Sequence, residues 1–291
     1  MEKADNLASS HPAKAYIALM KPGIIMGNGI TAVGGFALAS RGHFDFWLFV
    51  AMFFGLSFII GSACAFNNYI DRDADKKMGR TQNRALAKGT LPHRNALFFA
   101  SFIGLLGTLL LAFYVNTLTT LIALCGFVIY VFAYSFMKYR STHATLVGSI
   151  AGAVPPVVGY CAVSQHFDLG AVLLFFIIAL WQMPHFYAIA IYRREEYAAA
   201  SIPVLPVKEG IAKTKIQMVI YVAAYFIASV LPTLFGYTGM VYLSIAVFLG
   251  SVWLFLSLQG FKAKNDALWA RKMFLFSLVI VTVLCSALVA F

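Results

Sequence analysis

The chain contains the stretch Asn67-Asn68-Tyr69-Ile70-Asp71-Arg72-Asp73-Ala74-Asp75, which directly follows a long apolar run that ends near Phe66. Asn67, Asp71 and Asp75 are spaced four residues apart, so on a helix their oxygen-bearing side chains stack along one face. The three acids in this short stretch repel one another unless positive charge lies among them. The stretch therefore predicts a cation site at the end of a membrane helix.

Two carboxylates and an amide oxygen on one face suit a hard divalent cation such as Mg²⁺, which often bridges to the phosphates of a substrate. An Arg guanidinium matches phosphate oxygens in a two-pronged fork, which singles out Arg80 and Arg84 just downstream. A calcium loop is excluded, because Lys76 stands where that loop needs Gly and Gln82 where it needs Glu. The alternative is a solvated helix end whose acids balance neighbouring lysines.

Composition places the chain in a membrane. Of its 291 residues, 61% are hydrophobic and 11% are charged, with a mean hydropathy of +0.82, whereas a soluble domain carries about 25% charged residues. The net charge of +11 is explained by loop charges that set topology. No nucleic acid is expected as a partner, because no basic stripe with interleaved aromatics lies outside the apolar segments. The four cysteines form no CxxC pair, which argues against zinc or a disulfide framework, and no removable signal peptide is expected.

Nine apolar segments, each near the length that a bilayer requires, predict an all-α polytopic membrane bundle around a central cavity. They cover approximately residues 22–39, 46–66, 95–115, 118–137, 143–163, 169–192, 216–235, 240–258 and 272–291. We expect one integral-membrane domain over residues 1–291, with a polar tail at 1–20 and long active-site loops at 67–94 and 193–215.

The charges of the connecting segments predict the topology. With nine spans, 21 of the 22 Lys and Arg residues fall on one side, and only Arg41 falls on the other. The positive-inside rule then predicts a cytoplasmic N-terminus, cytoplasmic long loops and a C-terminus on the opposite side. The expected location is the inner membrane of a bacterium, where that opposite side is the periplasm. The two long loops are four helices apart, which indicates two similar halves that place polar loops over one cavity.

Small residues and prolines predict how the spans pack. Gly23 and Gly27 give the first span a small face that favours close helix packing. Asn28 beside them either faces a cavity or bonds to another helix. Pro155 and Pro156 remove backbone donors and predict a break or kink in the fifth span.

Further candidate residues lie in the later loops and in the sixth span. Lys138 and Arg140 either bind phosphate or serve only as topology charges. The acidic pair Glu195-Glu196 could hold another metal or the same diphosphate, or form helix-end ion pairs with adjacent arginines. His185 lies within a span, where ionisable side chains are functional candidates, either as a haem ligand or as an acid or base. Its alternative role is an interhelical hydrogen bond.

The acidic stretch resembles the first aspartate-rich motif of the intramembrane aromatic prenyltransferases. Within that superfamily, nearly the whole chain is similar to the protohaem IX farnesyltransferases, also called haem O synthases. The other stretches that carry the resemblance are Lys21-Pro22-Gly23, Met78-Gly79-Arg80-Thr81-Gln82-Asn83-Arg84, Gly152-Ala153-Val154-Pro155-Pro156-Val157-Val158-Gly159, Trp181-Gln182-Met183-Pro184-His185-Phe186, Tyr197-Ala198-Ala199-Ala200-Ser201-Ile202-Pro203-Val204-Leu205-Pro206-Val207 and Trp269-Ala270-Arg271-Lys272. The Pro-Pro and Trp-Gln-Met-Pro-His stretches point to the haem branch.

The resemblance implies a reaction and a set of residues for it. Mg²⁺ and basic side chains hold farnesyl diphosphate, a vinyl group of haem B attacks the allylic cation, and water completes haem O. Haem B is thus a substrate rather than a cofactor. The implied catalytic residues are Asn67, Asp71, Asp75, Arg80, Arg84 and Glu196, of which Asn67, Asp71 and Asp75 bind Mg²⁺ and Glu196 is a weaker metal candidate. The implied substrate-binding residues are Lys138, Arg140, Tyr197, Trp181 and, for haem, His185.

One departure concerns the second acidic motif. The superfamily usually has two aspartates four residues apart there, whereas this chain has Glu195-Glu196-Tyr197, and Ala200 follows four residues after Glu196. The number of metal ions therefore stays open. Aromatic side chains such as Phe66, Tyr69, Trp181 and Tyr187 are expected to line a dry cavity that protects the cation from water.

Two other functions remain open from the sequence. One is a prenyltransferase for another aromatic acceptor, such as a quinone precursor. The other is a transporter or a haem-binding membrane protein without catalysis, which broken helices and polar residues within spans would also suit. For the haem branch, the expected partners are the lipid bilayer and, downstream, a haem A synthase or a terminal oxidase.

Overall fold

The computed structural model describes residues 12–289, and every regular secondary-structure element within them is a helix, with no strand. Nine helical segments are long and apolar enough to span a membrane in this part of the chain, which confirms the predicted all-α bundle. They are α2 (Pro22–Ser40), α3 (Phe46–Asp75), α5 (His93–Tyr114), α6 with a π-helix and α7 (Thr117–Met137), α8 with α9 (Ala144–Ser164), α10 (Leu169–Tyr192), α13 (Ile211–Leu234), α14 with a 3₁₀ turn (Met240–Lys262) and α15 (Asp266–Ala287).

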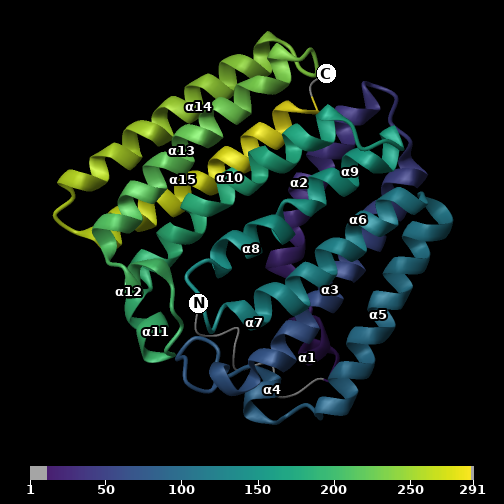
Figure 1. Cartoon of the computed structure of the whole chain (residues 1–291). Coiled ribbons are helices and arrows are strands. Elements are labelled where there is room, and N and C mark those ends of the chain that lie inside the picture. The colour runs from purple at the N-terminus through teal and green to yellow at the C-terminus, as the bar shows by residue number, and fades with distance from the viewer. Residues whose placement is uncertain (1–11, 290–291) are drawn as a thin grey trace.

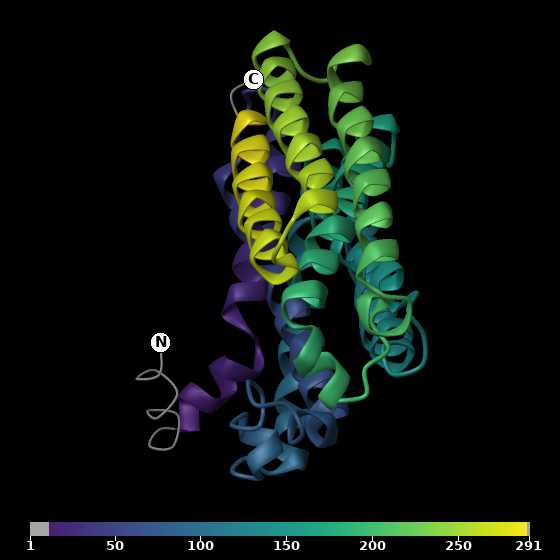
Figure 2. The same cartoon turned by 90° about the vertical axis from the view of Figure 1, so that its left-hand side faces the viewer.

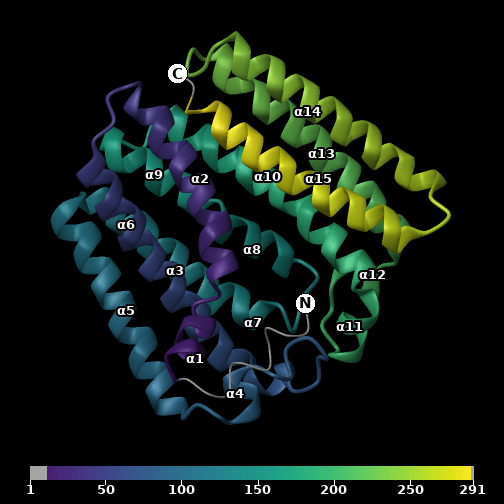
Figure 3. The ribbon, with the colours of Figure 1, turned by 180° about the vertical axis from the view of Figure 1, so that it is seen from behind.

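Short helices occupy the connections at one end of the bundle (Figures 1 and 2). They are α1 (Pro12–Leu19), α4 (Ala85–Lys88), α11 (Arg194–Ala199) and α12 (Leu205–Lys208). Viewed from behind, α4 and α11 again lie at the same end, so the two predicted loops meet there (Figure 3). The side of the membrane on which this end lies remains the prediction made from charge.

Three helices extend by more than one turn beyond their predicted limits. Helix α3 continues from the apolar run to Asp75, so residues 67–75 form its last turns and the loop begins at Lys76. Helices α13 and α15 begin at Ile211 and Asp266, several residues before the apolar segments predicted at 216 and 272. Hydropathy marks only the part of a helix that suits lipid, whereas backbone hydrogen bonding continues into the polar region.

The fifth span is broken, as Pro155-Pro156 predicted. Helix α8 (Ala144–Gly152) ends at Gly152, Ala153 interrupts the span, and α9 (Val154–Ser164) begins directly before the two prolines. Proline is tolerated in a first helical turn, because the N–H groups of that turn have no partner within the helix. The fourth span is also irregular, since a π-helix covers Ile129–Tyr134 between α6 (Thr117–Val128) and α7 (Ser135–Met137).

Close packing of α2 against α9 uses different glycines from those predicted. A Cβ on Gly35 would collide with the carbonyl oxygen of Pro156, and one on Gly159 would collide with that of Ala32. By contrast, nothing lies within 4 Å of a Cβ built on Gly23 or Gly27. The predicted packing role of Gly23 and Gly27 is therefore wrong, because that part of α2 borders open space.

We predict that Gly35→Ala destabilises the protein and that Gly27→Ala on the same helix does not. The added methyl at Gly35 meets backbone, which must shift, and such overpacking costs about 1–3 kcal/mol. At Gly27 the methyl enters open space, and alanine is the better helix former. Thermal unfolding of the detergent-solubilised variants, followed by intrinsic fluorescence, measures both effects. Equal midpoints for the two variants would contradict the packing argument.

Candidate active site

A cavity of about 860 Å³ lies inside the bundle at the end where the loops meet. Its walls come from α2, α3, the π-helix, α8, α9, α10 and α15, and both loops contribute to its mouth. Thr81 and Arg84 belong to the first loop, and Tyr197 and Ile202 belong to the second. Residues of both predicted loops therefore line one cavity, and the role of these loops in an active site stays a prediction.

The acidic face of α3 forms the polar part of this cavity. Asn67, Asp71 and Asp75 all line it, although only 2%, 5% and 4% of their surfaces remain exposed. Asp73 lies on the opposite side of the helix, where it is exposed and pairs with Lys76. The spacing of four residues therefore brings together the predicted oxygen atoms and leaves the third acid in solvent.

Each of the three buried oxygen groups has a cationic partner from another segment. Lys21 Nζ donates to Asn67 Oδ1 at 2.9 Å. Lys138 forms an ion pair with Asp71, and Tyr139 Oη donates to the same carboxylate at 2.8 Å. Arg84 Nη1 contacts both Asp75 oxygens, at 2.8 and 3.0 Å. Buried carboxylates require such partners, because burying a charge without one is very costly.

The surroundings of these partners are poor in water. Burial lowers the pKa of the half-buried Lys21 amine to about 8, which leaves it mostly protonated at neutral pH. Burial is also the main cause that lowers the pKa of Lys138, and the Asp71 carboxylate opposes this effect. Burial, followed by the charge of Asp71, raises the pKa of the Tyr139 phenol, which therefore remains a hydrogen-bond donor.

The donor set suits a hard divalent cation. The described residues hold no cluster of three or more His, Cys, Asp or Glu side chains with metal-binding geometry. The candidate set here is instead two carboxylates and one amide oxygen, on one helix face and open to one cavity. Mg²⁺ is commonly bound by one or two carboxylates and completes its shell with water and substrate phosphates. The residues present therefore fit the predicted metal.

The predicted loop residues fall into two groups. Arg80 and Tyr197 line the cavity mouth, where Met78, Ala200 and Ile202 form a small apolar cluster that holds the two loops together.

Glu196 and Arg140 are not among the residues that line the cavity. Glu196 is partly exposed, and its carboxylate lies 3.3 Å from Arg193 Nη1. This contact is the helix-end ion pair that the sequence offered as the alternative to metal binding. Arg140 is exposed. Their proposed roles stay predictions.

The aromatic lining differs from the expected set. Trp181 does line the cavity, but Phe66, Tyr69 and Tyr187 do not. Phe66 packs edge-on against Phe127, and Tyr69 contacts Arg72.

Other aromatic side chains line the cavity instead, and they include Phe127, Tyr130, Tyr134 and Phe186. Tyr130 and Tyr134 lie on the π-helix with ring centroids 5.3 Å apart. Helix irregularities of this kind, which the sequence pattern does not reveal, often occur at functional sites.

His185 lies on the cavity wall formed by α10 and α15. Its ring stacks on Trp181 with centroids 4.8 Å apart, and its Nδ1 is 2.7 Å from Ser277 Oγ. The Ser277 hydroxyl donates its single proton to the carbonyl of Phe274 at 2.6 Å. His185 Nδ1 must therefore carry the proton in this hydrogen bond, which leaves Nε2 with a free lone pair. His185 therefore both forms an interhelical hydrogen bond and lines the cavity.

Two residues of the site were missed by sequence reasoning. Lys21 was noted only within a stretch that carries the resemblance, and Tyr139 was passed over between Lys138 and Arg140. A lysine directly before a membrane helix and a tyrosine in a short basic loop are common features, so neither carries a signal by itself. Asn28, whose role was left open, lines the cavity and donates to Ile24 of its own helix.

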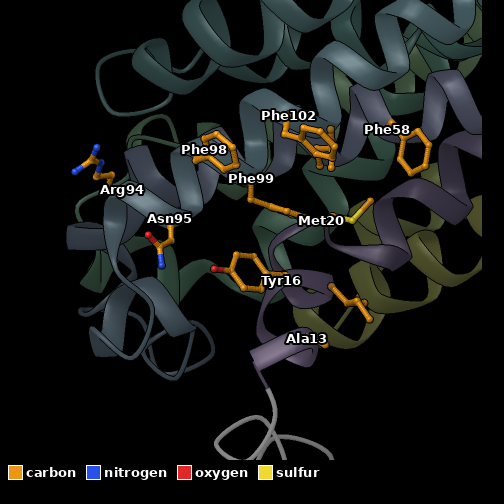
Figure 4. Close-up of a pocket in the computed structure, with 11 residues that line it drawn as sticks. Ala13, Tyr16, Met20, Phe58, Arg94, Asn95, Phe98, Phe99 and Phe102 are labelled. Atoms are coloured by element: carbon orange, nitrogen blue, oxygen red, sulfur yellow. The ribbon is translucent and has the colours of Figure 1, made fainter.

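A second hollow of about 700 Å³ lies between α1, α3 and α5 (Figure 4). Its lining is mainly apolar, with Phe98, Phe99 and Phe102 from α5 and Met20 from the linker after α1. Arg94 is the one charged side chain among the described residues that line it. It holds no carboxylate, so the larger cavity is the candidate active site.

Comparison with known proteins assigns the class. The chain belongs to the UbiA prenyltransferase family, whose sequence profile matches residues 28–279. It is 51% identical over 269 residues to a protoheme IX farnesyltransferase of Protochlamydia amoebophila. That alignment covers 92% of this chain and 95% of the relative. A protoheme IX farnesyltransferase of Yersinia enterocolitica is also 51% identical, over 92% of this chain and 91% of that protein. The resemblance found in the motifs is confirmed.

Solved structures agree with the fold. A structure from work on digeranylgeranylglyceryl phosphate synthase has a TM-score of 0.81 at 19% identity, covering 96% of this chain and 97% of its own. A UbiA homolog from Archaeoglobus fulgidus bound to GPP and Mg²⁺ has a TM-score of 0.68 at 15% identity, covering 95% of this chain and 100% of its own. At these identities the likeness shows the helical architecture.

We predict strong coupling between Asp71 and Lys138 in folding stability. Asp71→Leu leaves the buried ammonium of Lys138 unpaired, and breaking a buried pair in this way costs about 3–5 kcal/mol. The double variant Asp71→Leu/Lys138→Met removes both charges and should recover much of this loss. Unfolding free energies of the wild type, both single variants and the double variant form the test. Additive effects of the two single changes would show that the pair is not coupled.

Proposed function

We propose that this chain transfers the farnesyl group of farnesyl diphosphate to a vinyl group of haem B, giving haem O and diphosphate. The observation that carries this proposal is the 51% identity over 92% of the chain to protoheme IX farnesyltransferases. The cavity supports this proposal, because both the acidic face of α3 and His185 of α10 line it, and most of the remaining lining is apolar. A diphosphate and a flat, largely apolar acceptor can therefore meet there.

The diphosphate end of the substrate belongs at α3. Asn67, Asp71 and Asp75 would hold Mg²⁺, which, when bound, neutralises charge that develops on the leaving diphosphate. Arg84 and Lys138 lie beside these oxygens, and Arg80 lies at the mouth, so the chain itself supplies cations to the same leaving group. As the C–O bond breaks, the electron pair leaves with the diphosphate and the farnesyl carbon becomes an allylic cation.

The walls protect this cation until haem B reacts. The rings of Phe127, Tyr130 and Tyr134 line the cavity next to the acidic face. Aromatic faces attract cations, and an apolar wall excludes water that would capture the farnesyl group too early. The vinyl carbon of haem B then bonds to the farnesyl carbon. Water adds to the resulting cation and loses a proton, which leaves a hydroxyethylfarnesyl group.

The acceptor belongs at the wall formed by α10 and α15. Ser277 fixes the tautomer of His185, so that the lone pair of Nε2 is available as a ligand for haem iron. Trp181 helps to hold the imidazole of His185 in place, because its indole stacks on that ring and its Nε1 donates to the Ser277 carbonyl at 2.9 Å. We propose that His185 contacts haem and that Trp181 and Ser277 orient it.

The proposed setting is the inner membrane of a bacterium, with the mouth of the cavity facing the cytoplasm. The bias of Lys and Arg toward the loop side supports this orientation. The product would pass to a haem A synthase or a terminal oxidase.

We predict that Asp71→Asn and Asp75→Asn abolish haem O formation while Asp73→Asn does not. Asp71 and Asp75 are buried in the cavity, whereas the Asp73 side chain is 69% exposed on the other side of the helix. Membranes that contain each variant, supplied with haem B, farnesyl diphosphate and Mg²⁺, are extracted, and the haem mass is measured. Haem O from either buried-site variant at the wild-type rate would remove the metal role. If the wild type farnesylates only a quinone precursor, the acceptor assignment is wrong.

We also predict that His185→Ala weakens haem B binding and alters its absorption spectrum, while His166→Ala leaves both unchanged. His166 is exposed beyond the far end of α9, which makes it a matched control. Titration of the purified variants with haem B measures the affinity, about tenfold or more being expected for loss of a ligand bond. Unaltered affinity in His185→Ala would leave His185 with only its hydrogen bond to Ser277.

A further inference from the structure

Lys21 lies at a bend in the backbone that its side chain does not favour. It joins α1 to α2 with φ 52° and ψ 71°, in the left-handed region, and it directly precedes Pro22. A residue with a Cβ is strained in this region, and glycine would be the ordinary choice. Strain of this kind persists where the surrounding structure holds it, and it concentrates at functional sites. The strained backbone at Lys21 therefore indicates that the lysine side chain has a function at this position.

The side chain of Lys21 reaches Asn67, and the chemistry of the neighbours fixes how they meet. Ser135 Oγ donates to the Tyr130 carbonyl at 3.0 Å, so it must accept from Asn67 Nδ2, also at 3.0 Å. The amide oxygen of Asn67 consequently points to Lys21 Nζ, which can only donate. This oxygen is the atom that Asn67 would offer to a metal.

The same relation holds along the whole acidic face. Lys21 donates a hydrogen bond to Asn67, Lys138 forms an ion pair with Asp71, and Arg84 forms an ion pair with Asp75. These three cations come from three separate segments, and they face two carboxylates and one neutral amide. The face therefore has an excess of positive charge before any ligand arrives. A divalent cation alone would add to this excess and compete with the lysines and the arginine, whereas a diphosphate would supply the missing negative charge.

We propose that Lys21 is a diphosphate-binding residue that occupies the amide oxygen of Asn67 until the metal and the diphosphate enter together. The inference rests on the proposed function, because it takes the acidic face as the metal–diphosphate site. Metal entry displaces Lys21 from Asn67, and the freed ammonium binds a diphosphate oxygen. Binding of metal and diphosphate is consequently synergistic, and Lys21 is one source of the synergy.

Binding of Mn²⁺ to the purified full-length chain in detergent tests this, with inorganic pyrophosphate as the second ligand. Equilibrium dialysis, with the same total Mn²⁺ and pyrophosphate on the protein-free side, measures the Mn²⁺ bound to the protein with and without pyrophosphate. In the wild type, pyrophosphate should tighten Mn²⁺ binding about tenfold or more. Lys21→Met should bind Mn²⁺ alone several-fold more tightly, and most of the enhancement by pyrophosphate should be lost. Lys14→Met, which removes an exposed lysine on α1, should behave as the wild type.

A second variant separates the side chain from the backbone. Lys21→Gly removes the ammonium and accommodates the positive φ without strain, so it should show the same two changes as Lys21→Met. The proposal is overturned if Lys21→Met binds like Lys14→Met, if it binds Mn²⁺ alone more weakly than the wild type, or if only the Met variant differs. If the wild type shows no enhancement by pyrophosphate, the metal–diphosphate site itself fails, and Lys21 fails with it.

Discussion

The structure depends on one constraint, which is that charge buried in a membrane protein must be paired. Helix α3 carries Asp71 and Asp75 on a face that points into the bundle. Their partners Lys138 and Arg84 follow different spans, so pairing the two acids draws the loops after α3 and α7 toward each other. Lys21 adds the linker before α2 to the same point. These buried polar contacts therefore join three segments at the polar end of the bundle, beside the apolar cluster of Met78, Ala200 and Ile202.

Two of the spans that line the cavity are not continuous regular helices. The break between α8 and α9 at Ala153 and the π-helix at Ile129–Tyr134 both border it. Farther along the bundle, α2 and α9 approach so closely at Gly35 and Pro156 that no Cβ fits between them. The open region near Gly23 and Gly27 and the tightly packed region near Gly35 lie on one helix. Together they give a chamber that is polar at the loops and apolar within, as a diphosphate with a long apolar tail requires.

The sequence predicted the spans well because hydropathy responds to the lipid environment that each residue meets. The limits of α10 were predicted without error, whereas α3, α13 and α15 extend past their apolar segments, since a helix does not end where lipid ends. The site was predicted in part. Asn67, Asp71 and Asp75 share a helix, so their spacing alone placed them together. The aromatic lining was not predictable in this way, because the direction of Tyr130 and Tyr134 depends on a local change of helix type.

The sequence by itself determined the class of fold, the acidic face and the resemblance to a prenyltransferase family, because each follows from residues that are near one another in the chain. Only the tertiary structure decided which cations meet that face. Lys21 and Asn67 are 46 residues apart, and Lys138 and Asp71 are 67 apart, so no local pattern links them. The same holds for His185 and Ser277, which are 92 residues apart and together fix a tautomer. Long-range pairing of buried polar groups depends on how the helices pack, and that packing is a property of the whole bundle.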